Sequence, residues 1–357
     1  MKSSVSIATR TPARTAAAFA SLGLTLGLVL ALSGCSSDGT TFGDTNGAPS
    51  TGVYVIQNTP ATTTAAATGT ILQFSTSASG AATPDSTIAN LNVTSLAFLA
   101  VDGIGDIYTE AAEGTTGTSI LEFPVDSSNN AQPTRSIPFN TTTGLTAMSS
   151  LAVDATGDIY ASNTTGGVSV FGPTATGSIA PTSAVNTTSG AGPQATAVDP
   201  SGNLYIATAT PLNSTPIAPI EVFPTGATIP SRTLSGALTT LAIGSPQGMA
   251  TDSASNLYVA NVVSGVSSIL VFEPTATGNT PPLRDITGSN TLLGCVGGIA
   301  LDNEGYLYVV SVPTCGSPAS PTVLKFSTTG DGNIAPVATF TSSAWTTPDP
   351  TLSIAVY

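Results

Sequence analysis

Apolar and polar residues alternate in short runs from residue 52 to the end of the chain, and Gly- and Pro-containing turns separate the runs. The clearest example is "SSLAVDATGDIYASN", residues 149–163, in which one apolar run ends at Asp154 and a second begins after the next Gly. Period-two alternation over a few residues predicts half-buried β-strands, and a Gly between two such runs predicts a hairpin. The pattern therefore indicates short strands and contains no helical periodicity.

The hairpin recurs five times, as "LAVDGIGDIYTEA", "LAVDATGDIYASN", "TAVDPSGNLYIAT", "MATDSASNLYVAN" and "IALDNEGYLYVVS". Each copy is followed by a strand ending in Phe, a Gly-rich turn, a Pro and a short apolar strand. The recurring Phe residues are Phe74, Phe123, Phe171, Phe223, Phe272 and Phe326, and the recurring Tyr residues are Tyr108, Tyr160, Tyr205, Tyr258 and Tyr308. Four short strands per repeat are the content of one β-propeller blade.

The two ends of the repeat region complete one another. "STGVYVIQN" supplies a second strand that has no first strand before it, and the final "TLSIAVY" has the form of a first strand. Pairing the C-terminal strand into the N-terminal blade closes the ring and removes the exposed edges of an open sheet. The fold class expected is therefore all-β, a six-bladed propeller with four-stranded blades.

The first 51 residues have a different pattern. A basic stretch, an uncharged apolar stretch and "SGCSSDGTT" follow one another, which is the order of a secretory signal peptide. The sequence before Cys35 resembles the bacterial lipobox, which implies lipidation of Cys35, and Ser36 resembles a signal for the outer membrane. We expect a signal peptide at 1–34, a lipidated Cys and flexible tether at 35–51, and the propeller at 52–357. A membrane-spanning helix is the alternative, but the apolar stretch is short for one.

Charge and composition exclude several functions. Residues 35–357 hold four basic and twenty acidic residues, a formal charge of −16, so nucleic-acid binding is not expected. There is no His, which excludes Ser-His-Asp and Cys-His catalysis and removes the commonest metal ligand. An enzyme on this chain would depend on carboxylates, Tyr, Lys or an oxygen-bound metal ion.

The repeated aspartates allow two interpretations. They are Asp102, Asp154, Asp199, Asp252 and Asp302. A ring of carboxylates around the channel could hold a divalent cation. The favoured interpretation is turn chemistry, because Asp before x-x-Gly accepts hydrogen bonds from the amides of its own turn. A residue present in nearly every blade serves a need that every blade shares.

Other candidates are single residues or small sets. Cys295 and Cys315 flank the last hairpin, and in an exported protein we expect a disulfide rather than a metal or redox site. Arg135, Arg232 and Arg284 begin outer strands, where a charge discourages edge aggregation. The recurring aromatic residues are expected to fill the space between blades, with carbohydrate stacking as the alternative. Trp345 is either a lid over the core or an exposed contact. A metal site remains open at Asn58, Asn163, Asn261, Glu110 and Glu113.

The pattern "VD-x-x-G-[DN]-[IL]-Y" resembles NHL-type repeats, which occur in six-bladed propellers of the NHL and gluconolactonase/regucalcin-like groups. The resemblance covers residues 52–357 and implies the architecture, although the basic residues of NHL repeats are missing. Gluconolactonase-like propellers bind a divalent metal at the channel mouth through Glu and Asn or Asp, but no residue here matches those ligands one by one. A Ca²⁺-type lactonase or other carbohydrate-active hydrolase is therefore the alternative function.

The favoured function is a non-catalytic binding or scaffold module, exported and anchored by lipid to the cell membrane or outer membrane. Near-consensus repeats and the lack of His favour it. We expect no cofactor, with Ca²⁺ as the alternative, and a monomer that meets the membrane through its anchor alone. Its partner is a protein, a glycan or a small ligand, with the body in the periplasm or at the cell surface.

Overall fold

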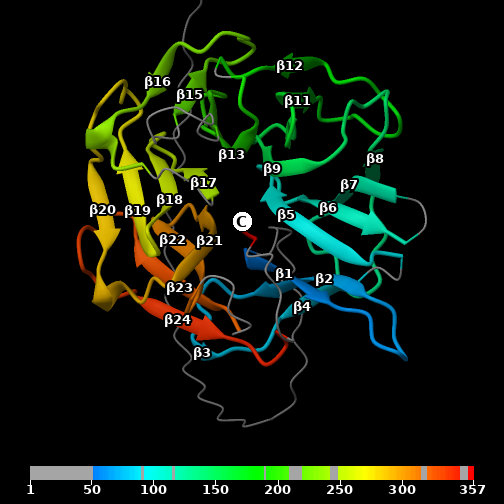
Figure 1. Ribbon diagram of the computed structural model, residues 1–357. Helices are drawn as coiled ribbons and strands as arrows, with labels where there is room; N and C mark the ends of the chain where they lie inside the picture. The colour runs from blue at the N-terminus through cyan, green and yellow to red at the C-terminus, as the bar shows by residue number, and fades with distance from the viewer. Residues whose placement is uncertain are drawn as a thin grey trace, which may run out of the picture. The chain divides into compact units, whose positions relative to one another are not determined.

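The computed structural model describes residues 51–89, 92–114, 117–188, 190–208, 219–241, 248–314, 320–345 and 353–357. These residues form six antiparallel four-stranded sheets arranged in a ring, with a fifth, two-residue strand on one of them (Figure 1). The six-bladed propeller expected from the repeats is confirmed. It lies within one compact unit, Ala48–Tyr357. No helix among the described residues is long and apolar enough to cross a membrane, and the expected signal peptide lies outside them.

We number the blades from the N-terminal end of the described chain. Blade 1 contains β25 (Ile354–Val356), β1 (Val53–Thr59), β2 (Thr68–Phe74) and β4 (Ser86–Ala89). Blade 2 contains β5 (Ser95–Val101), β6 (Ile107–Glu113), β7 (Gly117–Phe123) and β8 (Arg135–Pro138). Blade 3 contains β9 (Met148–Val153), β10 (Ile159–Asn163), β11 (Val168–Phe171) and β12 (Ser183–Val185).

The other three blades repeat this order from the inner to the outer strand. Blade 4 contains β13 (Pro193–Val198), β14 (Leu204–Thr208), β15 (Ile220–Phe223) and β16 (Arg232–Leu234). Blade 5 contains β17 (Gly248–Thr251), β18 (Leu257–Val263), β19 (Val266–Phe272) and β20 (Arg284–Thr287). Blade 6 contains β21 (Cys295–Leu301), β22 (Tyr306–Val312), β23 (Thr322–Ser327) and β24 (Ala338–Thr341), to which β3 (Gly80–Ala81) is added. Short 3₁₀ helices, η1 (Ala237–Thr239) and η2 (Ser289–Thr291), precede β17 and β21.

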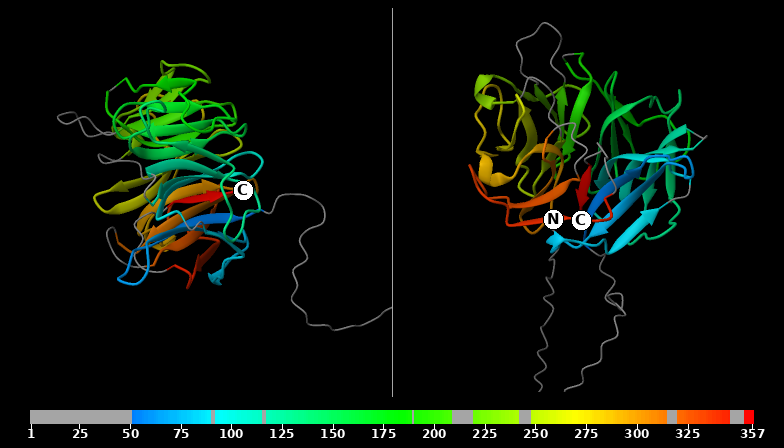
Figure 2. Two further views of the ribbon diagram at one scale, coloured as in Figure 1. Left: turned by 90° about the vertical axis from the view of Figure 1, so that its right-hand side faces the viewer. Right: turned by 60° about the horizontal axis from the view of Figure 1, so that its bottom comes forward.

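The ring closes in blade 1, where the last strand of the chain pairs with the first (Figure 2). Tyr54 of β1 lies opposite Ala355 of β25, in the register that Tyr108 and Ala100 have in blade 2. The backbone groups of Gly52 and Tyr357 exchange two hydrogen bonds of 3.1 Å. The C-terminal strand therefore replaces the inner strand that blade 1 lacks in the linear sequence.

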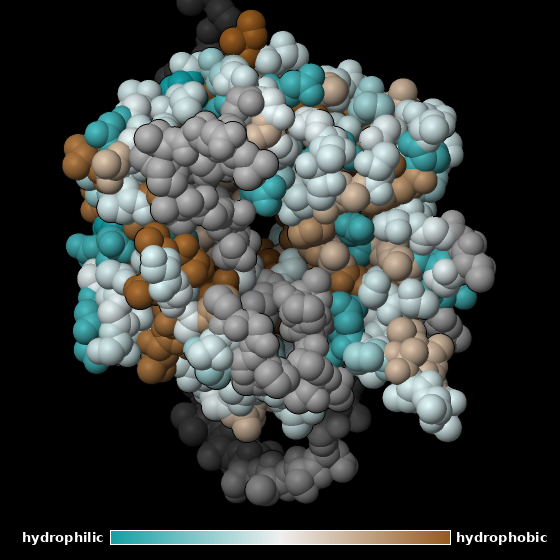
Figure 3. All heavy atoms as spheres, viewed as in Figure 1, coloured by the Kyte–Doolittle hydropathy of each residue, from teal (hydrophilic) through white to brown (hydrophobic). Residues whose placement is uncertain are grey.

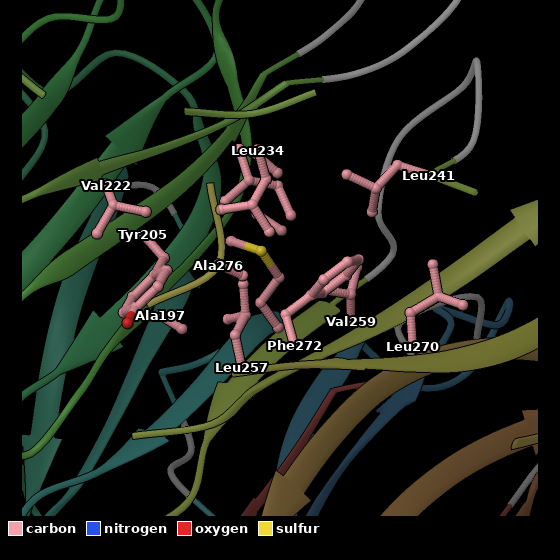
Figure 4. Packing of buried hydrophobic residues seen from close by; sticks show 14 residues of the cluster. Ala197, Tyr205, Val222, Leu234, Leu241, Leu257, Val259, Leu270, Phe272 and Ala276 are labelled. Carbon is pink, nitrogen blue, oxygen red and sulfur yellow. The ribbon is translucent and has the colours of Figure 1, made fainter. Parts of the chain in front are cut away.

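Neighbouring blades are held together by six apolar clusters, each of which combines residues of two adjacent blades. Between blades 4 and 5, Tyr205 and Val222 of one blade pack with Leu257 and Phe272 of the next (Figure 4). The recurring Tyr and Phe rings are the largest fully buried side chains, with Tyr160 somewhat less buried. Burying one large side chain contributes about 1.5–3 kcal/mol, so the aromatic residue that each repeat supplies is a principal source of ring stability.

Four inner strands contain a β-bulge at equivalent places. One extra residue interrupts the pairing at Phe98 in β5, Ser149 in β9 and Gln194 in β13, and β21 is irregular at Gly297 and Gly298. Phe98 has φ 53°, a left-handed conformation that non-glycine residues rarely adopt. A bulge adds local twist to a strand, and in these four of the six inner strands the irregularity lies four or five residues before the repeated Asp of the turn.

Candidate functional site

Each repeated Asp organises the turn between the first and second strands. In blade 4, one Asp199 carboxylate oxygen accepts hydrogen bonds from the amides of Ser201 and Asn203, both at 2.9 Å. The other oxygen accepts from Asn203 Nδ2 at 2.8 Å and from the Tyr205 hydroxyl at 3.3 Å. The same two-amide and tyrosine pattern is made by Asp102, Asp154, Asp252 and Asp302. These carboxylates hold turns and tyrosines in place.

The Arg residues of the outer strands extend this network, and the expectation that they act as charges on an exposed edge is wrong. Their side chains turn inward, because the tyrosine hydroxyls offer acceptors there. Arg135 donates to Tyr108 at 2.7 Å, Arg232 to Tyr205 at 3.2 Å and Arg284 to Tyr258 at 3.1 Å. We call each such Arg–Tyr–Asp chain of hydrogen bonds a clamp. It joins the outer strand to the Asp turn between the first and second strands.

Two of these clamps also reach the next blade. Arg135 donates to the carbonyl of Pro173, and Arg232 donates to the carbonyl of Pro274. In blade 6, Lys325 takes the corresponding part: its ammonium lies 4.0 Å from the Asp302 carboxylate and donates to the carbonyl of Thr76 at 3.0 Å. Burial raises the pKa of Tyr258 and Tyr308, so both hydroxyls stay protonated and available as donors. The sequence shows the spacing of these residues but not the inward direction of the Arg side chains.

The six inner strands border the channel and contain no charged residue within the part of the chain that the structure describes. Their hydroxyl groups connect neighbouring blades. The Ser353 hydroxyl accepts from the amide of Leu99 at 2.7 Å, and Thr251 donates to the carbonyl of Val198 at 2.8 Å. Ser150 and Thr196 share a hydrogen bond of 2.8 Å. These side chains join the inner strands of neighbouring blades.

The Asn residues proposed as metal ligands do not come together at one site. Asn58 binds the backbone of Leu96 in blade 2, accepting from its amide at 2.7 Å and donating to its carbonyl at 2.9 Å. Asn163 and Asn261 are buried and bind their own blades or the adjoining connection. Among the residues that the structure describes, no group of three or more His, Cys, Asp or Glu side chains could hold a metal ion.

The two acidic candidates of blade 2 differ from each other. Glu113, at the end of β6, accepts a hydrogen bond of 2.7 Å from the hydroxyl of Ser119. Glu110 lies in mid-strand between Ala97 and Ile120, and desolvation by burial raises its pKa to about 7. The other blades have Ile56, Ser162, Ala207, Ala260 and Val310 at that position. Glu110 is therefore a titratable group with no counterpart, placed in an apolar neighbourhood.

The remaining candidates are Trp345 and the cysteines. Trp345 is buried and stacks on Phe340, with ring centroids 6.0 Å apart, so it is a lid over this core. Cys295 begins β21, opposite Val312. Cys315 and Cys35 lie outside the described residues, so the disulfide and the lipid anchor stay predictions. Figure 3 shows that the visible face is mostly pale, weakly polar residues with several separate hydrophobic patches.

Comparison with known proteins identifies the fold and nothing finer. A protein of unknown function from Bacteroides caccae has a similar crystal structure, with a TM-score of 0.51 and 10% sequence identity over 86% of this chain and 99% of that one. No protein-family model matches the chain, and no curated protein matches it. The chain is thus similar to a solved structure of comparable extent, and its site chemistry has to be argued from its own residues.

Proposed function

We propose that the protein is an exported, lipid-anchored propeller that acts as a non-catalytic binding or scaffold module at the cell envelope. The observation that carries the non-catalytic part is the make-up of the inner strands. A hydrolase site at the channel needs several acidic or amide groups that converge there. The described inner strands have one amide side chain, Gln194, and otherwise supply hydroxyls, several of which are engaged between blades. The repeated carboxylates are likewise engaged in turns.

Anchoring at Cys35 would tether the disc from one side. The chain enters the propeller at Gly52, which is bonded to Tyr357 on the side of the blades where the Asp turns lie. The sixteen residues from 36 to 51 can span about 50 Å when extended. We therefore infer that the tether leaves the propeller from its Asp-turn side and is long enough to hold the disc away from the membrane. The rim of the disc and the side opposite the tether then remain accessible to partners.

Two further parts of the proposal concern the family and the last blade. The repeated turn motif supports kinship with NHL-type and gluconolactonase-like propellers at the level of architecture. The register of β21 and β22 supports a Cys295–Cys315 disulfide, because Cys295 lies opposite Val312, three residues before Cys315. Such a bond would link the start of β21 to the segment that follows β22.

The proposal is tested by the fate of the N-terminus. Expression of the full chain in a bacterial host is expected to give a membrane-bound protein whose N-terminal peptide begins at an acylated Cys35. Cys35→Ala is expected to abolish acylation and release the body to the soluble fraction. Recovery of Cys35→Ala in membranes at the level of the unchanged chain would contradict anchoring. Lactone hydrolysis by the purified body that depends on Ca²⁺ would contradict the non-catalytic role.

A further inference from the structure

A loop from the next blade covers the outer strand in five of the six blades. Over blade 4, the amide of Gly278 donates to the carbonyl of Thr233 at 2.7 Å, and the amide of Ser235 donates to the carbonyl of Gly278 at 2.9 Å. The same kind of contact covers the other four edges through Asn129 on blade 1, Gly177 on blade 2, Gly332 on blade 5 and β3 on blade 6. The covering segment thus occupies the outward backbone groups of each edge.

The covering loop is the one between the third and fourth strands of a blade, and its length decides whether it reaches the outer strand of the preceding blade. The outer strand begins twelve residues after the Phe in five blades, as from Phe272 to Arg284. In those blades the covering residue is the sixth after the Phe and has positive φ, as Gly278 does at 59°. In blade 4 the interval from Phe223 to Arg232 is nine residues. The loop that should cover blade 3 is therefore three residues too short.

Among the residues that the structure describes, none pairs with the outer edge of blade 3. Residues 224–231 are all described, and no backbone hydrogen bond from them to β12 occurs there. By alignment with blade 4, the carbonyl of Ala184 and the amide of Asn186 point outward. Ser183, Ala184 and Asn186 are exposed, whereas the matching residues of blade 4 (Arg232, Thr233 and Ser235) are half-buried. Blade 3 lies on the ring between the labels β9 and β12 in Figure 1.

Apart from its shortness, three residues, this edge strand contains none of the features that usually protect an edge, such as Lys, Pro or a covering loop. Ser183 stands where three other blades have Arg, so there is no Arg–Tyr clamp. Ile179, on the loop leading into β12, is 43% exposed, and Ile229, on the short loop of blade 4, is 76% exposed. An extended peptide that adds to a sheet edge binds through hydrogen bonds to the free backbone groups of the edge strand and through contacts of its side chains with neighbouring apolar groups. The outer edge of blade 3 and its two bordering loops offer both.

We propose that the outer edge of blade 3 is a docking site that takes an extended segment of a positively charged partner protein as a fifth strand. Charge selects this occupant. Residues 136–231 contain no Lys or Arg, and of their four acidic residues Asp154 and Asp158 are partly exposed. Asp158 and Thr182 both lie near Gly172, close to the start of β12. A second copy of this chain would bring two bodies of charge −16 together, which like-charge repulsion opposes.

This inference rests on the proposed binding role but not on the lipid anchor. The test uses the whole propeller and two synthetic peptides carrying the covering sequence of residues 275–283, one flanked by lysines and one by glutamates. We expect the lysine-flanked peptide to perturb the backbone NMR signals of residues 182–187 and to bind about tenfold more tightly than the glutamate-flanked one at low salt. Raising the salt concentration should reduce that difference.

Two variants make the test specific. In the first, residues 224–231 are replaced by residues 273–283 of blade 5, so that the loop again reaches the edge. In the second, Asn186→Pro removes one outward N–H at a position where blade 2 has Pro138, so the fold tolerates proline there. Both are expected to lose peptide binding while their circular dichroism and melting temperature stay close to those of the parent.

The possible results distinguish failure of the docking site from failure of the proposed function. Equal binding by the parent and the loop-replacement variant, or no binding by the parent, overturns the docking site while leaving anchoring and a binding role at another surface intact. A concentration-dependent dimer that the loop replacement abolishes would make a second copy the occupant and overturn the charged partner. Loss of membrane anchoring in the parent chain would count against the proposed function and not against this edge.

Discussion

Removing one turn carboxylate should destabilise the whole ring, and Asp199→Ala is the most informative change. Asp199 is 3% exposed and accepts four hydrogen bonds, from two backbone amides, one side-chain amide and the hydroxyl of Tyr205. Tyr205 is 2% exposed and accepts in turn from Arg232. Truncation leaves the tyrosine hydroxyl without its acceptor inside the interface between blades 4 and 5.

The size of the effect follows from these contacts. A hydrogen bond to a charged group contributes about 1.5–3 kcal/mol, and an unsatisfied buried group costs about 1–3 kcal/mol. The exposed turn amide of Ser201 regains water, so most of the loss comes from Asn203 and Tyr205. We expect a loss of about 2–4 kcal/mol in the free energy of unfolding. For a domain of about 300 residues that corresponds to a decrease of about 3–6 °C in melting temperature.

The assay is differential scanning calorimetry of the purified body, with Glu273→Ala as the matched control. Glu273 is exposed, so this change removes one carboxylate without removing a buried acceptor. Asp199→Asn keeps one acceptor oxygen and should give an intermediate melting temperature. A decrease for Asp199→Ala no larger than that for Glu273→Ala would refute the assignment of the repeated Asp to turn structure.

Three further predictions concern other side chains. Burial raises the pKa of Glu110 to about 7, so the unfolded chain loses this proton at lower pH than the folded one. The free energy of unfolding should therefore fall by about 1–2 kcal/mol as pH rises from about 4.5 to 7, a value reduced for partial solvent screening. Chemical denaturation of Glu110→Gln at several pH values should show that this part of the pH dependence is lost. Arg232→Met should lower the free energy of unfolding by about 1–3 kcal/mol in urea titrations, because it removes hydrogen bonds to Tyr205 and to the carbonyl of Pro274. An effect as small as that of Glu273→Ala would contradict this role of Arg232. Cys295→Ser should cost about 3 kcal/mol and leave one thiol that is alkylated without reduction, whereas two alkylated thiols in the unreduced parent would contradict the disulfide.

The repeats made the architecture predictable, because each blade has to bury the same large rings and turn at the same place. Tyr205 and Phe223 recur at fixed positions and fill the space between blades, as their spacing indicates. Pairing of "TLSIAVY" with "GVYVIQN" followed from the missing inner strand, and the observed register confirms it. Such features are local or periodic, so they are visible in one sequence.

The sequence does not predict the direction of the outer-strand Arg side chains. It also does not predict which loops pair with the outer strand of the preceding blade. Whether Arg232 points to solvent or to Tyr205 depends on the twist of blade 4 and on the acceptors of blade 5. The importance of a nine-residue interval after Phe223 appears only when Gly278 is seen to bond to Thr233. Contacts between blades join residues about forty positions apart, and no local pattern encodes them.

Amide hydrogen exchange of the unliganded propeller tests most directly the claim that blade 3 presents an open edge to a partner. Ser235 and Thr287 donate to covering loops at 2.9 and 3.2 Å, so their amides should be protected by about a hundredfold or more relative to an unstructured peptide. Asn186, at the matching position of blade 3, should exchange at close to the unstructured rate and become protected when the lysine-flanked peptide binds. Protection of Asn186 equal to that of Ser235 in the unliganded protein would show that this edge is already covered and would contradict the account.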